Sequence, residues 1–198
     1  MSLSDHAFYP ENLGVDRKPL THRQSANPRK QMGETDSLLP EKITSVASKQ
    51  TYYTIRLLVD RDRVFDAYRA YAYFRWVDDC LDQSLSTKSE RSAFVERQQA
   101  ILDGCYDGEC CSELTTEERM LAGLIQSDAA ENSGLRAYLQ NMMAVMAFDV
   151  DRRGRLISRD ELDEYSHHLS IGVTEALHYF IGHNDPSPCD QNTKNAEV

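Results

Sequence analysis

The sequence contains no uninterrupted apolar run of the roughly 20 residues that a membrane-spanning helix requires. Its first ten residues also lack the basic stretch followed by an apolar run that marks a secretory signal. These two absences predict a soluble, unsecreted protein of the cytoplasm. The cysteines are odd in number and form neither CxxC pairs nor zinc-like spacings with histidine, so we expect reduced thiols at Cys80, Cys105, Cys110, Cys111 and Cys189.

Basic residues are scarce relative to acidic ones. The chain has 22 Lys and Arg against 32 Asp and Glu, which gives a formal net charge of −10. Such a charge repels nucleic acid backbones and anionic lipid surfaces, so we predict no nucleic acid partner. An acidic protein can nevertheless bind a polyanion where divalent cations bridge carboxylates to phosphates.

Proline is absent from residues 41–185, and strand-like alternation is almost absent there as well. Apolar residues recur instead at spacings of three and four, which predicts an all-α bundle. The polar, proline-containing segments 1–42 and 184–198 are predicted to be disordered, which leaves 43–183 as one helical domain. Within it we expect helices over residues 43–59, 61–83, 88–104, 116–127, 133–148 and 158–182.

The segment YAYFRWVDDCLD, residues 71–82, carries most of the chemical information. On a helix, Tyr71, Arg75, Asp78 and Asp82 fall along one face. Two carboxylates one turn apart can share Mg²⁺, which prefers oxygen ligands and bridges carboxylates to substrate phosphates, and an arginine one turn earlier can hold a phosphate oxygen. The alternative is a solvated face on which Arg75 pairs with Asp79, worth only ~0.3–0.5 kcal/mol.

Two motifs resemble the squalene/phytoene synthase family, and the resemblance runs from about residue 46 to residue 183. Ser48-Lys49-Gln-Thr-Tyr52 is similar to the family's opening Ser-Lys-x-Phe-Tyr, and residues 71–82 are similar to its Tyr-Ala-x-x-Arg-x-x-Asp-Asp-x-x-Asp. A bare DDxxD also suits head-to-tail prenyl synthases and terpene cyclases. The preceding Tyr71 and Arg75 favour the head-to-head family.

This resemblance implies the fold and the roles of particular residues. The fold is an isoprenoid-synthase-like helical bundle. The metal ligands would be Asp78 and Asp82, with Asp79 nearby. Substrate contacts would come from Ser48, Lys49, Tyr52 and Arg75, and the catalytic cavity would involve Tyr71, Arg75 and Tyr165.

A third, weaker match begins at Tyr165. The segment Tyr165-Ser-His-His-Leu-Ser-Ile-Gly172-Val resembles the family's Tyr-Cys-x-x-Val-Ala-Gly-x-Val-Gly, a helix that lines the prenyl tunnel. Ile171 and Thr174 stand where the family has glycines. The simpler interpretation is that Leu162, Tyr165, Leu169 and Gly172 are ordinary core positions at helical spacing.

Residues 149–160 reproduce part of an EF-hand calcium loop, with acidic residues at loop positions 1, 3 and 12 and glycine at position 6. Position 5, which normally supplies an oxygen ligand, is Arg153, and position 12 is the short Asp160 in place of glutamate. Arg152 and Arg155 add positive charge where a dication would sit. We therefore expect a helix connection here, and calcium binding remains the minor alternative.

The implied chemistry is the head-to-head joining of two isoprenoid diphosphates, geranylgeranyl or farnesyl, to phytoene or squalene. Mg²⁺, or Mn²⁺ in its place, neutralises the departing diphosphate, and an apolar cavity shields the carbocation. NADPH is needed only if squalene forms. The lipid product makes peripheral membrane contact a further expectation. No residue distinguishes the C15 from the C20 substrate.

The family carries a second aspartate-rich motif on a later helix, and this sequence contains no candidate for it. Asp185 and Asp190 do not form an Asp-x-x-x-Asp pair. We therefore expect a bundle truncated before its C-terminal helices, with very low turnover. The alternative is a noncatalytic helical protein derived from the family, which completes its core with a partner or a second copy through exposed apolar surface.

Overall fold

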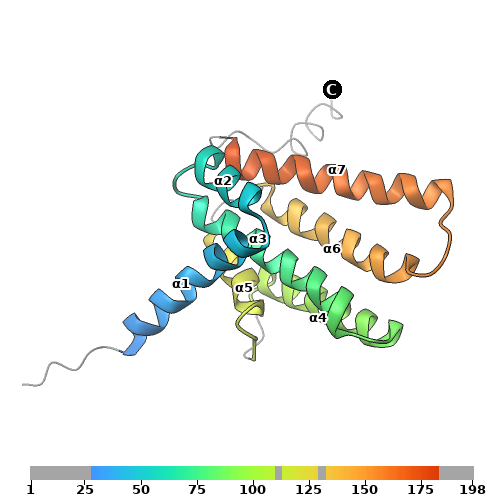
Figure 1. Ribbon diagram of the computed structural model, residues 1–198, viewed down its shortest axis with the longest axis horizontal. Helices are drawn as coiled ribbons and strands as arrows, with labels where there is room; N and C mark the ends of the chain where they lie inside the picture. The colour runs from blue at the N-terminus through green and yellow to red at the C-terminus, as the bar shows by residue number, and fades with distance from the viewer. Residues whose placement is uncertain (1–27, 110–112, 129–132, 183–198) are drawn as a thin grey trace, which may run out of the picture.

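The computed structural model describes residues 28–109, 113–128 and 133–182, and within these ranges it contains helices and no strand (Figure 1). This confirms the all-α prediction. The helices are α1 (Pro28–Ala47), α2 (Lys49–Leu58), α3 (Val64–Asp79), the π-helix η1 (Cys80–Ser84), α4 (Lys88–Tyr106), α5 (Glu118–Ser127), α6 (Leu135–Arg152) and α7 (Arg159–Ile181). Cys80 and Cys105 are thiols. The predictions for residues 1–27, 184–198, Cys110, Cys111 and Cys189 lie outside the described residues.

Helix α3 lies at the centre of the bundle and packs against α1, α2 and α5. Seven of its sixteen residues are buried, and Tyr73 and Val77 have no exposed surface. Helix α4 packs on α5 and α6, and α6 packs along α7 (Figure 1). Other helices cover most of α3. Its polar C-terminal residues, Asp78 and Asp79, lie where the helix reaches the surface.

The helix expected over residues 43–59 is two helices, and the break is at Ser48. Ser48 has extended backbone angles, φ −153° and ψ 106°, and its hydroxyl accepts a hydrogen bond from the Thr51 N–H at 3.1 Å. A serine that caps a helix in this way starts a new one. Helix α1 also begins at Pro28 and so includes part of the segment 1–42, for which we predicted disorder.

A buried polar network fixes α3 against α4 and α5. The Tyr73 hydroxyl donates to Gln98 Oε1 at 3.1 Å, and the Gln98 amide donates to Glu118 Oε1 at 3.0 Å. Arg97 donates to both Glu118 oxygens, at 2.8 and 2.9 Å. Burial alone would raise the pKa of Glu118, but the hydrogen bonds from Arg97, the Thr115 N–H and Gln98 outweigh it and lower the pKa to about 2.

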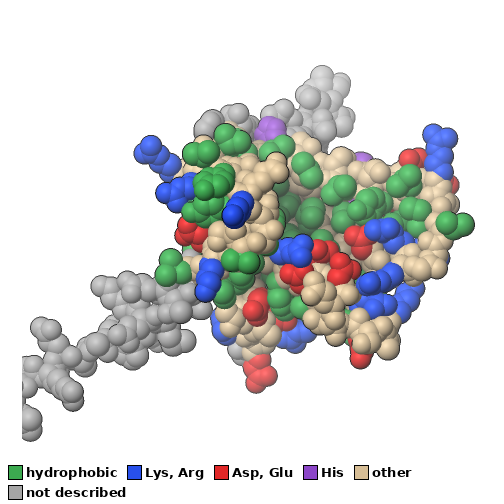
Figure 2. All heavy atoms as spheres, in the orientation of Figure 1, with side chains coloured by type: hydrophobic (Ala, Val, Ile, Leu, Met, Phe, Trp, Pro, Cys, Tyr) green, Lys and Arg blue, Asp and Glu red, His purple; other side chains and the backbone are tan. Residues whose placement is uncertain are grey.

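Apolar side chains remain exposed on α1, α2 and α7, and many green side chains gather on the face shown in Figure 2. Tyr53, Leu57 and Leu58 are exposed on α2, and Leu162, Val173 and Leu177 on α7. The core position predicted for Leu162 is wrong: it is 48% exposed, because α7 packs mainly on α6 and leaves its opposite side open. Gly172 is buried. None of the described helices has the length and apolarity needed to cross a bilayer.

Candidate functional site

The aspartate motif spans the junction between α3 and η1. The Leu85 N–H donates to the Cys80 carbonyl at 3.2 Å, five residues earlier, which is the π-helical spacing. Asp78 lies in the last turn of α3 and Asp82 lies in η1, so the two aspartates flank the point at which the π-helix begins. Single π-turns of this kind are frequent at functional sites.

Asp78 and Asp82 line the same cavity, which has a volume of about 610 Å³. The facing wall consists of the end of α6, with Asp149 and Arg152, and the loop from Arg153 to Leu156. Arg91 of α4 completes the charged lining, and Leu81, Met146 and Val150 supply apolar surface. The cavity therefore combines three carboxylates with four guanidinium groups.

Asp78 is in an unfavourable environment for a negative charge. Its pKa is raised, first by burial and then by the nearby charge of Asp82, with smaller contributions from Asp79 and Asp149, and Arg75 only partly offsets them. A divalent cation between Asp78 and Asp82 would relieve this repulsion. The two carboxylates suit Mg²⁺, which is held by one or two carboxylates together with substrate phosphates.

Such a site depends on its substrate for the remaining ligands. Among the residues that the structure describes, no group of three or more His, Cys, Asp or Glu side chains is arranged to hold a metal ion. The side chains of Asp78 and Asp82 are also 47% and 63% exposed. A metal ion at these two carboxylates would therefore need further ligands from a bound phosphorylated molecule, and the site is open to solvent.

Arg75 and Asp79 face a different hollow from Asp78 and Asp82. Arg75 Nη2 is 2.5 Å from Asp79 Oδ1, and Nη1 is 3.5 Å from Asp78 Oδ2. Arg75 and Asp79 line a hollow of about 420 Å³ whose other walls are α1 side chains, including Leu39 and Lys42. Arg75 therefore does not share a cavity with Asp78 and Asp82, as the prediction of a single helix face required. The Arg75–Asp79 ion pair is the one that the alternative interpretation, a solvated helix face, predicted.

Three of the predicted substrate-binding residues line neither cavity. Ser48 caps α2, and Lys49 is exposed. The ring of Tyr52 stacks on Tyr68 with 5.7 Å between centroids, and its hydroxyl donates to Glu41 at 3.2 Å. The contacts that these side chains make in the structure stabilise α1 and α2 against α3.

The two predicted cavity tyrosines are also set back from the aspartates. Tyr71 is half-buried against the hydrophobic core and lines neither cavity. Tyr165 packs on Phe148 with 5.1 Å between centroids, and the Arg152 guanidinium lies 5.9 Å from the Tyr165 ring. Tyr165 does not line the cavity itself, but it contacts Arg152, which does.

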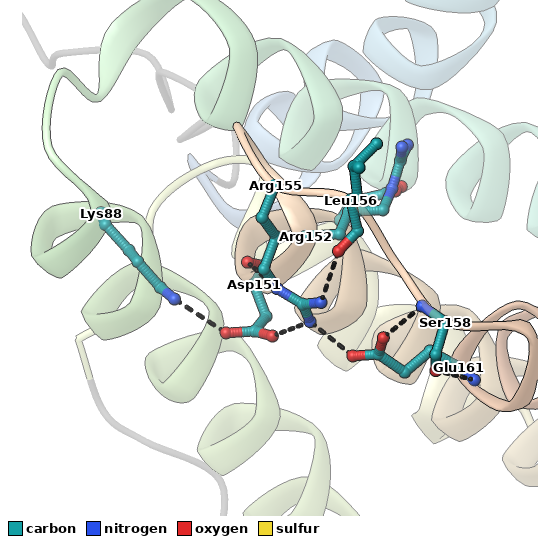
Figure 3. A network of polar contacts seen from close by, with 8 residues as sticks. Lys88, Asp151, Arg152, Arg155, Leu156, Ser158 and Glu161 are labelled. Atoms are coloured by element: carbon teal, nitrogen blue, oxygen red, sulfur yellow. Dashed lines mark hydrogen bonds and ion pairs between the residues drawn. The ribbon is translucent and has the colours of Figure 1, made fainter.

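The segment that resembles a calcium loop is an ion-paired helix connection (Figure 3). Asp149 and Asp151 lie in α6, which ends at Arg152, so the first positions of the supposed loop are helical. Asp151 pairs with Lys88 at 2.7 Å and with Arg155 at 2.6 Å. Arg155 also pairs with Glu161 of α7 at 2.7 Å. Gly154 has a φ of +82°, a conformation that glycine adopts readily, and it turns the chain towards α7.

Calcium titration is expected to produce no saturable heat and no change in helicity at millimolar concentrations. Two of the three acidic groups that calcium would need already pair with arginine or lysine: Asp151 as described above, and Asp149 with Arg152 at 2.5 Å. Isothermal titration calorimetry together with circular dichroism measures both quantities. Saturable binding that Asp149→Ala abolishes would contradict this prediction.

The sequence reasoning missed several residues of the site. Arg91 and Asp149 line the aspartate cavity, and Lys42 lines the second hollow. The Arg91 Nε atom is buried and has no hydrogen-bond partner in the structure. The arginines of residues 152–155 were recognised only as an obstacle to calcium. Their accumulation beside a loop glycine was a signal for a basic wall, whereas nothing in the sequence near Arg91 or Lys42 indicated that these residues would line a cavity.

Comparison with known proteins gives one match. A family model described as squalene/phytoene synthase matches residues 45–197, which is most of the chain. No curated protein and no solved structure matches. The matched range includes the aspartate motif, the facing wall of the cavity and all of α7.

Proposed function

Because the chain belongs to the squalene/phytoene synthase family, we propose that it is a Mg²⁺-dependent prenyltransferase of the head-to-head type, which binds its isoprenoid diphosphate in the cavity at Asp78 and Asp82. The observation that carries the proposal is the convergence of both aspartates on one cavity whose opposite wall is basic. If the two aspartates belonged only to a solvated helix face without function, nothing would require basic side chains on the wall opposite them. The substrate is geranylgeranyl or farnesyl diphosphate.

The charged residues of the cavity and its apolar residues would have different roles in the reaction. Asp78 and Asp82 would hold the metal ion, which when bound supplies Lewis-acid stabilisation to the departing diphosphate. The basic side chains opposite attract the phosphate oxygens, and Leu81, Met146 and Val150 exclude water from the inner end of the cavity. The outer end stays open, since both aspartates are about half exposed or more.

Because the cavity is open to solvent, we expect the 198-residue chain to bind a prenyl diphosphate but to convert it very slowly. With Mg²⁺ it should bind geranylgeranyl or farnesyl diphosphate, and EDTA should abolish the binding. Turnover should be very low, because ionisation requires a leaving group fixed in a water-excluded site. Calorimetry measures the binding, and diphosphate release with lipid analysis measures the turnover, with NADPH added to the farnesyl reactions. Binding that is insensitive to EDTA would contradict the metal role, and rapid turnover would contradict the argument from exposure.

A second candidate function has a specific observation in its favour. The apolar side chains exposed on α2 and α7 suit a noncatalytic helical protein that covers them with a partner or a second copy. The same titration separates the two functions. A folded protein that self-associates but binds no prenyl diphosphate in the presence of Mg²⁺ would support the noncatalytic alternative.

A further inference from the structure

Arg153 reaches the aspartate motif from the opposite wall of the cavity. Its Nη1 atom donates a hydrogen bond to the Leu81 carbonyl at 3.0 Å and lies 3.5 Å from Asp82 Oδ1. The side chain is 47% exposed. Its guanidinium is therefore beside a proposed metal ligand and is accessible from the cavity.

The other arginines of this wall pair with carboxylates that are not proposed metal ligands. Arg155 lies between Asp151 and Glu161, and Lys88 holds Asp151 from α4 (Figure 3). Arg152 pairs with Asp149. These contacts fix the connection from α6 to α7. Arg153 differs, because the carboxylate it contacts is one that a metal ion would take.

The charge of the cavity favours an anion once a metal ion has arrived. Its lining contains three carboxylates, Asp78, Asp82 and Asp149, and four guanidinium groups. The net charge of these lining residues is therefore +1 before any metal ion binds. The chain as a whole carries a formal charge of −10. The lining residues taken alone are thus less acidic than the chain as a whole, which weakens the local repulsion of a diphosphate, although Asp151 and Glu161 beside Arg155 add negative charge close by.

We propose that Arg153 is a diphosphate-binding residue of this cavity, an inference that rests on the proposed function. When a metal ion occupies Asp82, the Arg153 guanidinium loses its carboxylate partner while the Leu81 carbonyl still orients it. A guanidinium presents parallel N–H donors that match two oxygens of a phosphate. Arg153 would then bind the ligand from the cavity wall that faces Asp78.

Inorganic pyrophosphate titrated into the full chain with Mg²⁺ tests the role of Arg153. Arg153→Ala should bind it about tenfold more weakly than the wild type, because charge-assisted hydrogen bonds to phosphate are lost. Arg153→Lys should recover part of the loss, since lysine keeps the charge without the paired donors. The control is Arg159→Ala, which should bind as the wild type does, because Arg159 is 92% exposed and its one ion pair, with Asp163, is 4.0 Å long.

Binding of Mn²⁺ alone, followed by electron paramagnetic resonance, distinguishes a ligand contact from damage to the pocket. Arg153→Ala should bind Mn²⁺ at least as tightly as the wild type, because a competing cation has been removed from Asp82. Parallel loss of Mn²⁺ and pyrophosphate would show a disturbed cavity and overturn the inference. Wild-type pyrophosphate affinity in Arg153→Ala, with affinity lost in Asp82→Ala, would overturn the role of Arg153 and leave the proposed function standing. No binding by the wild type would overturn both.

Discussion

Alanine at Asp78 or at Asp82 is expected to weaken Mg²⁺-dependent binding of geranylgeranyl diphosphate by at least about 100-fold, roughly 2.8 kcal/mol. Mg²⁺ in such sites is held by only one or two carboxylates, so the loss of either leaves too few protein ligands to fix the ion against the phosphates. Both side chains line the cavity, and both are accessible to solvent. Calorimetric titration of each variant at fixed Mg²⁺ gives the affinity.

Two further variants locate the metal site on the aspartate helix. Asp163→Ala is the matched control, since Asp163 is 72% exposed on α7, away from the cavity lining, and should bind as the wild type does. Asp79→Ala should have a smaller effect than Asp78→Ala, because Asp79 pairs with Arg75 and lines the other hollow. A larger loss in Asp79→Ala than in Asp78→Ala would place the ion on the Arg75 side and contradict our assignment.

The features that the sequence predicted well are those that depend on neighbours in the chain. The helical spacing of apolar residues predicted α4 to within two residues at its C-terminus, and the start predicted for α7 coincides with its capping box at Ser158 and Glu161. Asp78 and Asp82 share a cavity because residues four apart lie on one side of a helix. The π-turn that lies between them has no recognised signal in the sequence.

The features that were not predicted depend on how the helices pack. Ser48 and Tyr52 belong to a motif resembling that of the family, yet α2 directs their polar groups to its own N-terminus and to Glu41. The contact between Arg153 and Asp82 joins positions 71 residues apart in the chain, so no periodicity could indicate it. Charge counting around residues 149–160 argued against calcium, but it could not show what the arginines face.

Glu118→Ala is expected to lower the free energy of unfolding by ~3 kcal/mol, the lower end of the cost of breaking a buried ion pair. The Glu118 side chain is 2% exposed and accepts hydrogen bonds from Arg97, Gln98 and the Thr115 N–H. Its removal leaves the buried Gln98 amide without an acceptor and loosens the contact of α5 with α4 and α3. Urea denaturation followed by circular dichroism measures the change. The control Glu96→Ala, at an exposed position of α4, should stay within about 0.5 kcal/mol of the wild type.

The contribution of Glu118 should also depend on pH in a defined direction. Its pKa in the folded protein is about 2, below the ordinary value of 4.5, so the folded state favours the charged form. This stabilisation is complete above the pKa of the unfolded chain and is lost as the pH falls from about 4.5 towards 2. Glu118→Gln removes the titrating group and keeps the shape, so the difference in unfolding free energy between wild type and Glu118→Gln should shrink over that window. A difference that stays constant with pH would show that the network stabilises the fold by packing and not by the charge of Glu118.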